Sequence, residues 1–351
     1  MAQSSDVVII ADDRTGALET AGRIAQRTGE SVEVRVMVDD LSARRVVGSW
    51  MNPICVVDAG TRHDRHQADR RMLRLADVIS APTRVLHKID SLLRGHWDIE
   101  LMALVGSMQR RAVMVPALPE AGRVCVGGTV LADGIPVDQL VDARAGASTS
   151  QPASRMHAIN VTYDELLDWV HGPDWIVVCD ASTREDLDRI AEVIDGHNDL
   201  IVSGSAEVVA HAIAGPPLDV ADPPVLHGPV VVIVGSVHPM AIAQADALAG
   251  RAGVTVVRSD LSVSDDPDAV IIELAKRSMP MLATAGTIIV VGGDTAAEVL
   301  GWNRMQVHGM VGPGMPWLTS ARFPAATVIT KPGSHGQPST LVDVLNARLQ
   351  A

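Results

Sequence analysis

Short apolar runs alternate with stretches of helical periodicity along most of the chain. The runs are rich in Val and Ile, and small polar residues separate them from the helical stretches. This alternation is typical of repeated strand–turn–helix units, in which consecutive strands lie parallel and helices cover both faces of the sheet. The pattern therefore predicts an α/β fold with mainly parallel sheets flanked by helices.

The runs predicted as strands fall into two groups. The first group comprises residues 7–10, 34–38, 54–57, 85–87, 112–115, 176–179 and 200–202. The second comprises residues 230–234, 254–257, 287–291 and 327–330. Helices are predicted between many of these runs, for example over residues 17–27, 68–79, 185–194, 241–249 and 296–300.

A proline-rich segment separates the two groups. Residues 215–229 contain five prolines and few helix formers, which favours a linker. A chain of 351 residues also exceeds the usual size of a single core. We therefore predict two domains, residues 1–222 and residues 223–351, each with its own sheet.

Charge and cysteine content narrow the class of protein. The formal net charge of −13 disfavours nucleic acid and anionic membranes as partners, so any bound phosphate must be held locally. Cys55, Cys125 and Cys179 show no C-x-x-C spacing, so neither a disulfide framework nor a zinc site is expected. No leader-like N-terminus and no apolar stretch of about 20 residues is present. A cytoplasmic protein is predicted, and a homo-oligomer stays open.

Polar residues follow the first predicted strand. Asp12 and Asp13 lie in the segment ADDRTGA, directly after residues 7–10. Ligands of open parallel sheets bind beyond the carboxyl ends of strands. Two carboxylates there can accept hydrogen bonds from substrate hydroxyls, and one can act as a general base. The simpler alternative is that an Asp caps the next helix and Gly16 eases the turn.

A second polar segment, HKIDSLLRGHWDIE, follows residues 85–87. Lys88, Asp90 and Arg94 supply two cations and an acceptor, a combination that suits a polyol bearing a carboxylate. A surface cluster of salt bridges is the alternative interpretation.

Three glycine-bearing turns follow strands of the second group. Gly292 and Gly293 let backbone N–H groups approach an anion, and Thr295 with Glu298 has the spacing of a capping box. Gly235 and Ser236 follow one further strand, and Lys331, Gly333 and Gly336 another. Three such turns indicate a nucleotide cradle, although plain capped turns would show the same pattern. P-loop, dinucleotide, zinc-protease and serine-hydrolase motifs are absent.

Taken together, these motifs resemble the four-carbon acid sugar kinase family. The resemblance runs nearly end to end and is carried by seven segments in the family's order, which are ADDRTGA, KIDSLLRG with the later Glu100, PALPEAGR, GS at 235–236, GGDT at 292–295, GPGMP and KPGSHG. The chain departs from the usual pattern at Arg14, Leu92, His96 and in the loop that ends at Gly336.

The resemblance implies a kinase in which residues 1–222 bind an acid sugar and residues 223–351 bind ATP. It carries substrate-side roles over to Asp12, Asp13, Arg62, Lys88, Asp90, Arg94 and Arg123, of which Asp12 and Asp90 are our catalytic candidates. Its nucleotide-binding positions are Ser236, Gly292, Gly293, Asp294, Thr295, Gly333 and Gly336. ATP and Mg²⁺ are the expected cofactors, with the magnesium ligands unassigned.

The expected reaction is ATP-dependent phosphorylation of threonate, erythronate or an oxo-tetronate at its terminal hydroxyl. In this hypothesis Lys88 and Arg94 clamp the substrate carboxylate, while Asp12 or Asp90 orients or deprotonates the attacking hydroxyl. The main alternative is a non-catalytic sensor that binds an acid sugar and a nucleotide. An NAD-dependent oxidoreductase is suggested by fold class alone.

Overall fold

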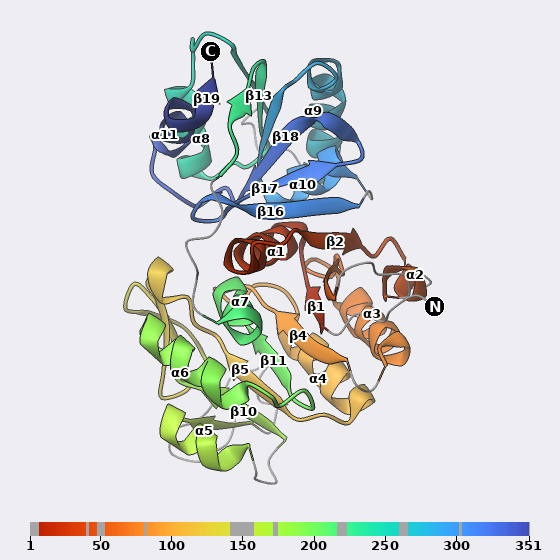
Figure 1. Cartoon of the computed structure of the whole chain (residues 1–351), viewed down its shortest axis with the longest axis vertical. Helices are drawn as coiled ribbons and strands as arrows, with labels where there is room; N and C mark the ends of the chain where they lie inside the picture. The colour runs from red at the N-terminus through yellow and green to blue at the C-terminus, as the bar shows by residue number, and fades with distance from the viewer. Residues whose placement is uncertain are drawn as a thin grey trace. The chain divides into compact units, whose positions relative to one another are not determined.

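The computed structural model describes residues 7–39, 42–47, 53–80, 83–140, 158–170, 175–215, 223–259, 266–301 and 304–350. The chain divides into two compact units (Figure 1). The first contains residues 1–20 and 36–218, and the second contains residues 21–35 and 219–351. Residue 222, where the domain boundary was predicted, lies outside the described residues.

The first unit is built on one parallel sheet. Its strand order is β3-β1-β4-β11-β5-β10-β9, and every recorded pairing between neighbours is parallel. The strands are β1 (Val7–Ala11), β3 (Ile54–Asp58), β4 (Arg84–Lys88), β5 (Ala112–Val115), β9 (Ala158–Val161), β10 (Ile176–Cys179) and β11 (Ile201–Gly204). Most of their residues are buried, which explains why they appear in the sequence as unbroken apolar runs.

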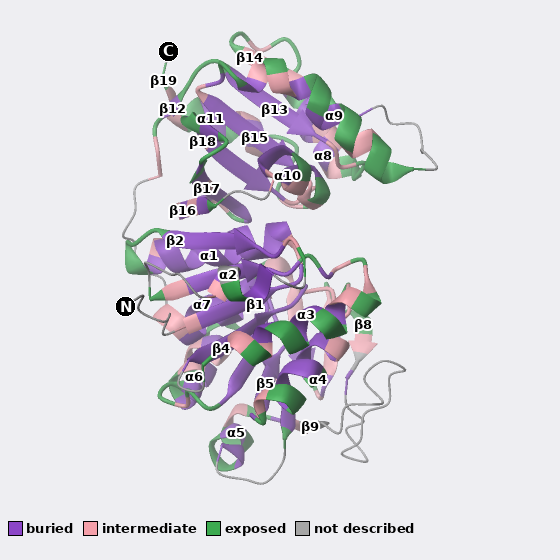
Figure 2. Ribbon diagram, turned by 90° about the vertical axis from the view of Figure 1, so that its right-hand side faces the viewer, coloured by how far each residue is buried: buried purple, intermediate pink, exposed green. Residues whose placement is uncertain are grey.

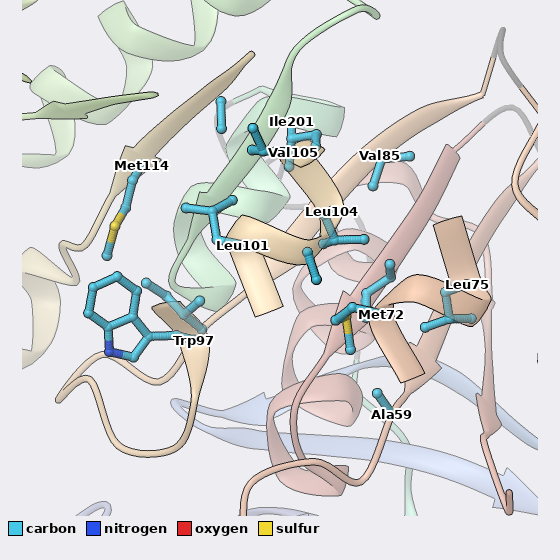
Figure 3. Close-up of a cluster of buried hydrophobic side chains, with 14 of the residues drawn as sticks. Ala59, Met72, Leu75, Val85, Trp97, Leu101, Leu104, Val105, Met114 and Ile201 are labelled. Atoms are coloured by element: carbon cyan, nitrogen blue, oxygen red, sulfur yellow. The ribbon is translucent and has the colours of Figure 1, made fainter. Parts of the chain in front are cut away.

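Helices α3 (Arg65–Val78) and α4 (Trp97–Met108) pack on one face of this sheet. Figure 3 shows Met72 and Leu75 of α3 and Leu104 of α4 in the same cluster as the strand residues Val85 and Ile201. Helix α7 (Ala206–Ala214) contacts β4 and β11 and lies beside α6 (Arg184–Ile194), which contacts α5 (Tyr163–Trp169). A short α2 (Ala43–Val47) contacts α3. Helix α1 (Arg14–Thr28) begins in the first unit and ends in the second.

A small antiparallel sheet in the first unit was not predicted. It follows the 3₁₀ turn η2 (Pro119–Ala121) and consists of β6 (Arg123–Val126), β7 (Thr129–Ala132) and β8 (Ile135–Gln139). Only one residue of β6 and one of β7 is buried, Cys125 and Val130. Such short, half-buried strands give a weak hydrophobic pattern.

The second unit combines parallel and antiparallel strands in the order β14-β13-β15-β18-β17-β16-β2. The first four are parallel, whereas β17 is antiparallel to both of its neighbours and β16 is antiparallel to β2. The strands are β2 (Val32–Val36), β13 (Val230–Val234), β14 (Val254–Arg258), β15 (Thr287–Val291), β16 (Met305–Gly312), β17 (Met315–Ser320) and β18 (Phe323–Lys331), with β12 (Leu226–His227) and β19 (Leu349–Gln350) pairing separately.

Helices of the second unit cover the parallel strands. Helices α8 (Pro239–Ala247) and α11 (Thr340–Arg348) share one hydrophobic cluster with β13, β15 and β18. Helices α9 (Pro267–Leu282) and α10 (Gly293–Leu300) contact each other, with α9 against β13 and α10 against β15. Figure 2 shows these central strands as buried. The predicted α/β fold class is confirmed for both units.

The strand prediction was wrong in several places, and β9 is among the strands that were not predicted. The strand predicted over residues 34–38 is β2, Val32–Val36, because the charged residues Glu33 and Arg35 are buried and paired with each other there, at 2.8 Å. The antiparallel β16 and β17 were missed, because Gly309, Gly312 and Pro316 interrupt their apolar pattern.

Gly106 offers a test of the packing of α4. It lies inside this helix, and a Cβ atom added to it would meet nothing within 4 Å. Since glycine in a helix interior is less favourable than alanine by about 1 kcal/mol, Gly106→Ala is expected to raise the free energy of unfolding by up to that amount. Urea denaturation measures the change, and a destabilised variant would show that α4 is packed differently.

Candidate functional site

The strands β3, β1 and β4 lie side by side, so their carboxyl ends meet at one edge of the first sheet. Ala11 at the end of β1 is in register with Asp58 of β3 and Lys88 of β4. Asp12 and Asp13 directly follow β1, and Asp90 follows β4. The polar residues predicted from the first two motifs and from the family resemblance gather at this edge. We call them the acid-side cluster: Asp12, Asp13, Arg62, Lys88, Asp90, Arg94 and Arg123.

Arg62 connects the carboxylates of the acid-side cluster. Its Nη2 donates to Asp12 Oδ1 at 2.8 Å and to Asp13 Oδ1 at 2.9 Å, and its Nε donates to Asp12 Oδ2. Its Nη1 lies 3.6 Å from Asp90 Oδ1. The backbone N–H groups of Thr61 and Arg62 both donate to the Asp12 carbonyl, at 2.9 and 3.2 Å. This segment therefore fixes the position of Asp12 through main chain and side chain together.

Asp12 and Asp90 differ in their protonation. Burial raises the pKa of Asp12 to about 6, although the hydrogen bond and charge of Arg62 act against this. Burial also raises the pKa of Asp90, but the hydrogen bonds from Arg94 and the charges of Arg62, Lys88 and Arg94 outweigh it and hold that pKa well below its usual range. Asp12 is therefore the carboxyl poised to exchange a proton near neutral pH.

The oxygens of Asp90 are already occupied by donors. Arg94 donates to both of them, from Nε at 2.9 Å and from Nη2 at 2.7 Å. The backbone N–H groups of Leu92 and Arg94 add bonds of 3.0 and 3.3 Å. The Arg94 side chain is nevertheless 64% exposed, so part of its guanidinium faces solvent. Arg123 Nη1 donates to Ser91 Oγ at 2.8 Å, which brings it to the same segment.

Lys88 is buried, yet no side chain of the described residues forms an ion pair or hydrogen bond with its ammonium group. A Cβ atom on Gly16 would lie only 2.5 Å from Lys88 Nζ and 2.6 Å from Asp13 Oδ1. Only glycine therefore lets the start of α1 approach this lysine. The Gly16 N–H donates to Asp13 Oδ1 at 2.9 Å, so the helix-capping interpretation holds for Asp13.

A buried polar network beneath the cluster was not predicted as part of the site. His87 shares hydrogen bonds with Ser203 Oγ at 3.1 Å and with Glu100 Oε2 at 3.0 Å. The other oxygen of Glu100 accepts the hydroxyl of Thr61, the residue before Arg62. All four side chains are fully buried. The signal for this network in the sequence was a histidine inside an apolar strand. Its hydrogen-bond partners lie in other segments, so they could not be predicted from the local pattern.

Arg14 and Asp58 form a second unpredicted pair. Arg14 Nε donates to Asp58 Oδ2 at 2.6 Å, and both side chains are at most 4% exposed. The other oxygen of Asp58 accepts the Gly60 N–H at 3.0 Å. Burial raises the pKa of Asp58, and the Arg14 guanidinium opposes this. The pair anchors the segment that leads to Arg62.

Loops after three adjacent parallel strands form a second candidate site. Val234 of β13 is in register with Val291 of β15, which is in register with Lys331 of β18. A Cβ atom on Gly235 would lie 2.0 Å from Thr295 Oγ1, and one on Gly333 would lie 2.0 Å from Ser236 Oγ. The loop after β13 therefore touches each of the other two loops through a glycine. We call all three the glycine loops: residues 235–238, 292–295 and 332–337.

The capping box predicted for Thr295 and Glu298 was wrong. Helix α10 begins at Gly293, its N-cap is Gly292 with a φ of +117°, and no side chain caps it. Thr295 is instead a buried residue in the first turn, packed against Gly235. Because no side chain accepts hydrogen bonds at the N-cap, the first N–H groups of α10 are available to an anion. Gly292, Gly293 and Asp294 all lie at this end of the helix.

Gly333→Ala tests whether the glycine loops hold a nucleotide. The added Cβ would displace Ser236, so ADP affinity is expected to fall at least about tenfold, by roughly 1.4 kcal/mol. Gly228→Ala, where a Cβ meets open space, is the control and should bind ADP like the unmodified protein. Isothermal titration calorimetry measures both, and equal affinities would place the nucleotide elsewhere.

No helix in the described part of the chain is both long and apolar enough for a membrane crossing. Within that part there is also no group of three or more His, Cys, Asp or Glu side chains arranged to hold a metal ion.

Family models match both halves of the chain. Residues 7–159 match a sugar-binding N-terminal domain, and residues 262–341 match a nucleotide-binding C-terminal domain. The acid-side cluster falls within the first match, and the loops after β15 and β18 fall within the second.

Two curated relatives cover nearly the whole chain, and a third covers about half of it. The chain is 26% identical to a D-threonate kinase of Cupriavidus necator, over 95% of this chain and 96% of that protein. It is 24% identical to a D-threonate kinase of Salmonella typhimurium, over 97% of each. A D-erythronate kinase of Heliobacterium modesticaldum is 28% identical, over 53% of this chain and 47% of that protein.

Solved structures share the fold. A Salmonella typhimurium protein superposes with a TM-score of 0.71 at 18% identity, covering 99% of this chain and 100% of that one. A Haemophilus influenzae protein does so with a TM-score of 0.66 at 17% identity, covering 97% and 99%. At these identities the likeness establishes the α/β fold alone.

Proposed function

Because the chain belongs to the four-carbon acid sugar kinase family, we propose that it transfers the γ-phosphoryl group of ATP to the terminal hydroxyl of a threonate- or erythronate-like acid. The observation that carries this proposal is a pair of buried groups. The ammonium of Lys88 forms no ion pair with a carboxylate of the described residues, and its charge lowers the pKa of Asp12, which burial nevertheless raises to about 6. Lys88 ends β4 and Asp12 follows β1, and these two strands are neighbours in the sheet. A cation for the substrate's carboxylate therefore lies next to a base for its hydroxyl.

On the acid side, Lys88 binds the substrate carboxylate, and Arg94 adds a second cation from the exposed side. Asp12 accepts the proton of the terminal hydroxyl as its oxygen bonds to the γ-phosphorus and the bond from that phosphorus to ADP breaks. Asp90 stays ionised and holds Arg94 and Arg62 in place. Arg62 keeps Asp12 oriented, and Asp13 and Arg123 offer further polar contacts to the hydroxyl groups.

On the nucleotide side, the glycine loops suit ATP. Backbone N–H groups at the start of α10 favour phosphate oxygens, and the contacts of Gly235 and Gly333 leave no room for larger residues. Mg²⁺ is usually held by one or two carboxylates together with phosphate oxygens and water. Asp294, the acidic residue in the first turn of α10, fits as such a ligand, and the ion would neutralise phosphate charge during transfer.

A coupled assay of ADP release tests the proposal. The panel contains D- and L-threonate, D- and L-erythronate and their oxo-acid analogues, each with MgATP. At least one acid is expected to raise ADP release well above the rate with ATP alone. Binding of both ligands without ADP release would favour the sensor alternative, and release that no acid stimulates would contradict the proposed substrate class.

A further inference from the structure

Lys331 is a second buried lysine that no proposed role has yet used. The chain contains three lysines, Lys88, Lys276 and Lys331, and Lys331 is only 1% exposed. It ends β18, and its Nζ donates to the backbone carbonyls of Pro332 at 2.6 Å and His335 at 2.7 Å. These two carbonyls flank Gly333, so the ammonium group holds the loop over residues 332–337 through its backbone.

The charge of Lys331 lacks a counterion. No carboxylate of the described residues forms an ion pair with it, and its recorded partners are neutral carbonyls. A buried cation without an opposite charge is unfavourable unless an anion is supplied. Burial accordingly lowers the pKa of Lys331 to about 8 and is the only cause of the shift.

Gln244 of α8 supports the same loop without any charge. It is fully buried, and its Nε2 donates to the carbonyls of His335 at 3.0 Å and Gln337 at 2.8 Å. The His335 carbonyl thus accepts from both side chains. Lys331 and Gln244 therefore both hold loop 332–337, and only Lys331 is charged.

We propose that Lys331 is a positioning residue of the nucleotide site, which holds loop 332–337 in its binding conformation and supplies a buried positive charge that the nucleotide phosphates neutralise. The proposal rests on the assignment of the glycine loops to ATP. Lys331 donates to backbone carbonyls of the loop, so it acts through these groups and through its electric field.

This arrangement couples nucleotide binding to proton uptake. Phosphate charge favours the protonated lysine, so the pKa of Lys331 is higher in the complex than in the free protein. As pH rises above about 8, the free protein loses the proton and binding must restore it, so affinity falls by up to about tenfold for each pH unit. The titratable and charged side chains on the surrounding elements are His238 at the N-cap of α8, Asp246 of α8, Asp294 and Glu298 of α10, His335 of the loop, and Asp343 and Arg348 of α11. None of them contributes to the shift of the Lys331 pKa.

The test compares MgADP affinity between pH 7 and pH 9 in the unmodified protein, Lys331→Met and Gln244→Ala. The unmodified protein is expected to bind about tenfold more weakly at pH 9 than at pH 7. Lys331→Met should bind at least about tenfold more weakly at pH 7 and show little further change with pH. Gln244→Ala loosens the same loop but keeps the charge, so its affinity should fall while its pH dependence persists. A Lys331→Met protein with unchanged affinity and slope would overturn the proposal.

The chain has only three lysines, so NMR of protein labelled with ¹³C at lysine Cε can follow Lys331 directly. This measurement does not require that a variant binds MgADP. The signal missing from Lys331→Met should titrate near pH 8 in the free protein and at higher pH once MgADP is added. An identical titration with and without MgADP would refute the coupling. If the unmodified protein binds no MgADP at all, the proposed function itself fails, so the two failures are distinguishable.

Discussion

Asp12→Asn is expected to lower kcat by about 10²- to 10⁴-fold, the range that a positioned general base contributes. An amide cannot accept the proton of the attacking hydroxyl, although it can still accept one hydrogen bond from Arg62. Binding of ADP depends on other loops and should not change. Steady-state kinetics with the acid identified by the panel, combined with ADP calorimetry, measure both quantities.

The pH dependence of the unmodified enzyme gives this prediction a second readout. Because burial raises the pKa of Asp12 to about 6, the reactive carboxylate is lost as pH falls through that value. The ratio kcat/KM should therefore decrease about tenfold per pH unit below about 6, and the residual activity of Asp12→Asn should lack this limb. Asp90→Asn also removes most turnover, but any residual activity should keep the limb, because the pKa of Asp90 lies well below its usual range. If Asp12→Asn retained both its rate and the acidic limb, another group would be the base.

Lys88→Met is expected to raise KM for the acid by about 100-fold, with a smaller effect on kcat. Removing one partner of a buried charge pair typically costs about 2–5 kcal/mol, and a hundredfold loss corresponds to about 2.7 kcal/mol. Methionine fills a similar volume, so the packing beside Gly16 is preserved. Lys88 also lowers the pKa of Asp12, so the acidic limb of kcat/KM should move to higher pH in this variant.

Lys276→Met is the matched control for that experiment. Lys276 lies exposed on α9, so the same substitution removes one positive charge far along the chain from the acid-side cluster. KM and the pH profile should stay as in the unmodified enzyme. Equal kinetic effects of the two substitutions would mean that net charge, and no specific contact of Lys88, governs substrate affinity.

The parallel strands could be predicted from the sequence because each is buried on both faces. Runs such as β13 (Val230–Val234) and β15 (Thr287–Val291) are apolar throughout, and their predicted bounds are those found in the structure. The gathering of Asp12, Lys88 and Asp90 was also predictable, because each follows a parallel strand and the carboxyl ends of such strands share an edge.

Contacts between distant segments could not be predicted. The pairing of Arg14 with Asp58 joins residues 44 positions apart, and that of Glu100 with Thr61 joins residues 39 apart. The capping motif at Thr295 was misleading because Gly292, with its positive φ, starts the helix earlier. The assignment of residues 21–35 to the second unit leaves no mark in a local pattern, because it depends on β2 pairing with β16.

Two departures from the family motif are explained by these contacts. Arg14 replaces an apolar residue but is satisfied by Asp58. Leu92 replaces a threonine, yet its bond to Asp90 comes from the backbone N–H, which any residue except proline supplies. Neither change removes a group to which the mechanism assigns a role, and this favours a kinase over a sensor.

The most direct test is ³¹P NMR of the reaction mixture after incubation with MgATP and the acid that stimulates ADP release. We predict a new phosphomonoester signal that couples to the two protons of a terminal CH₂ group and grows in step with ADP. A mixture in which ADP is accompanied only by inorganic phosphate, or in which the phosphomonoester couples to a single CH proton, would contradict transfer to the terminal hydroxyl.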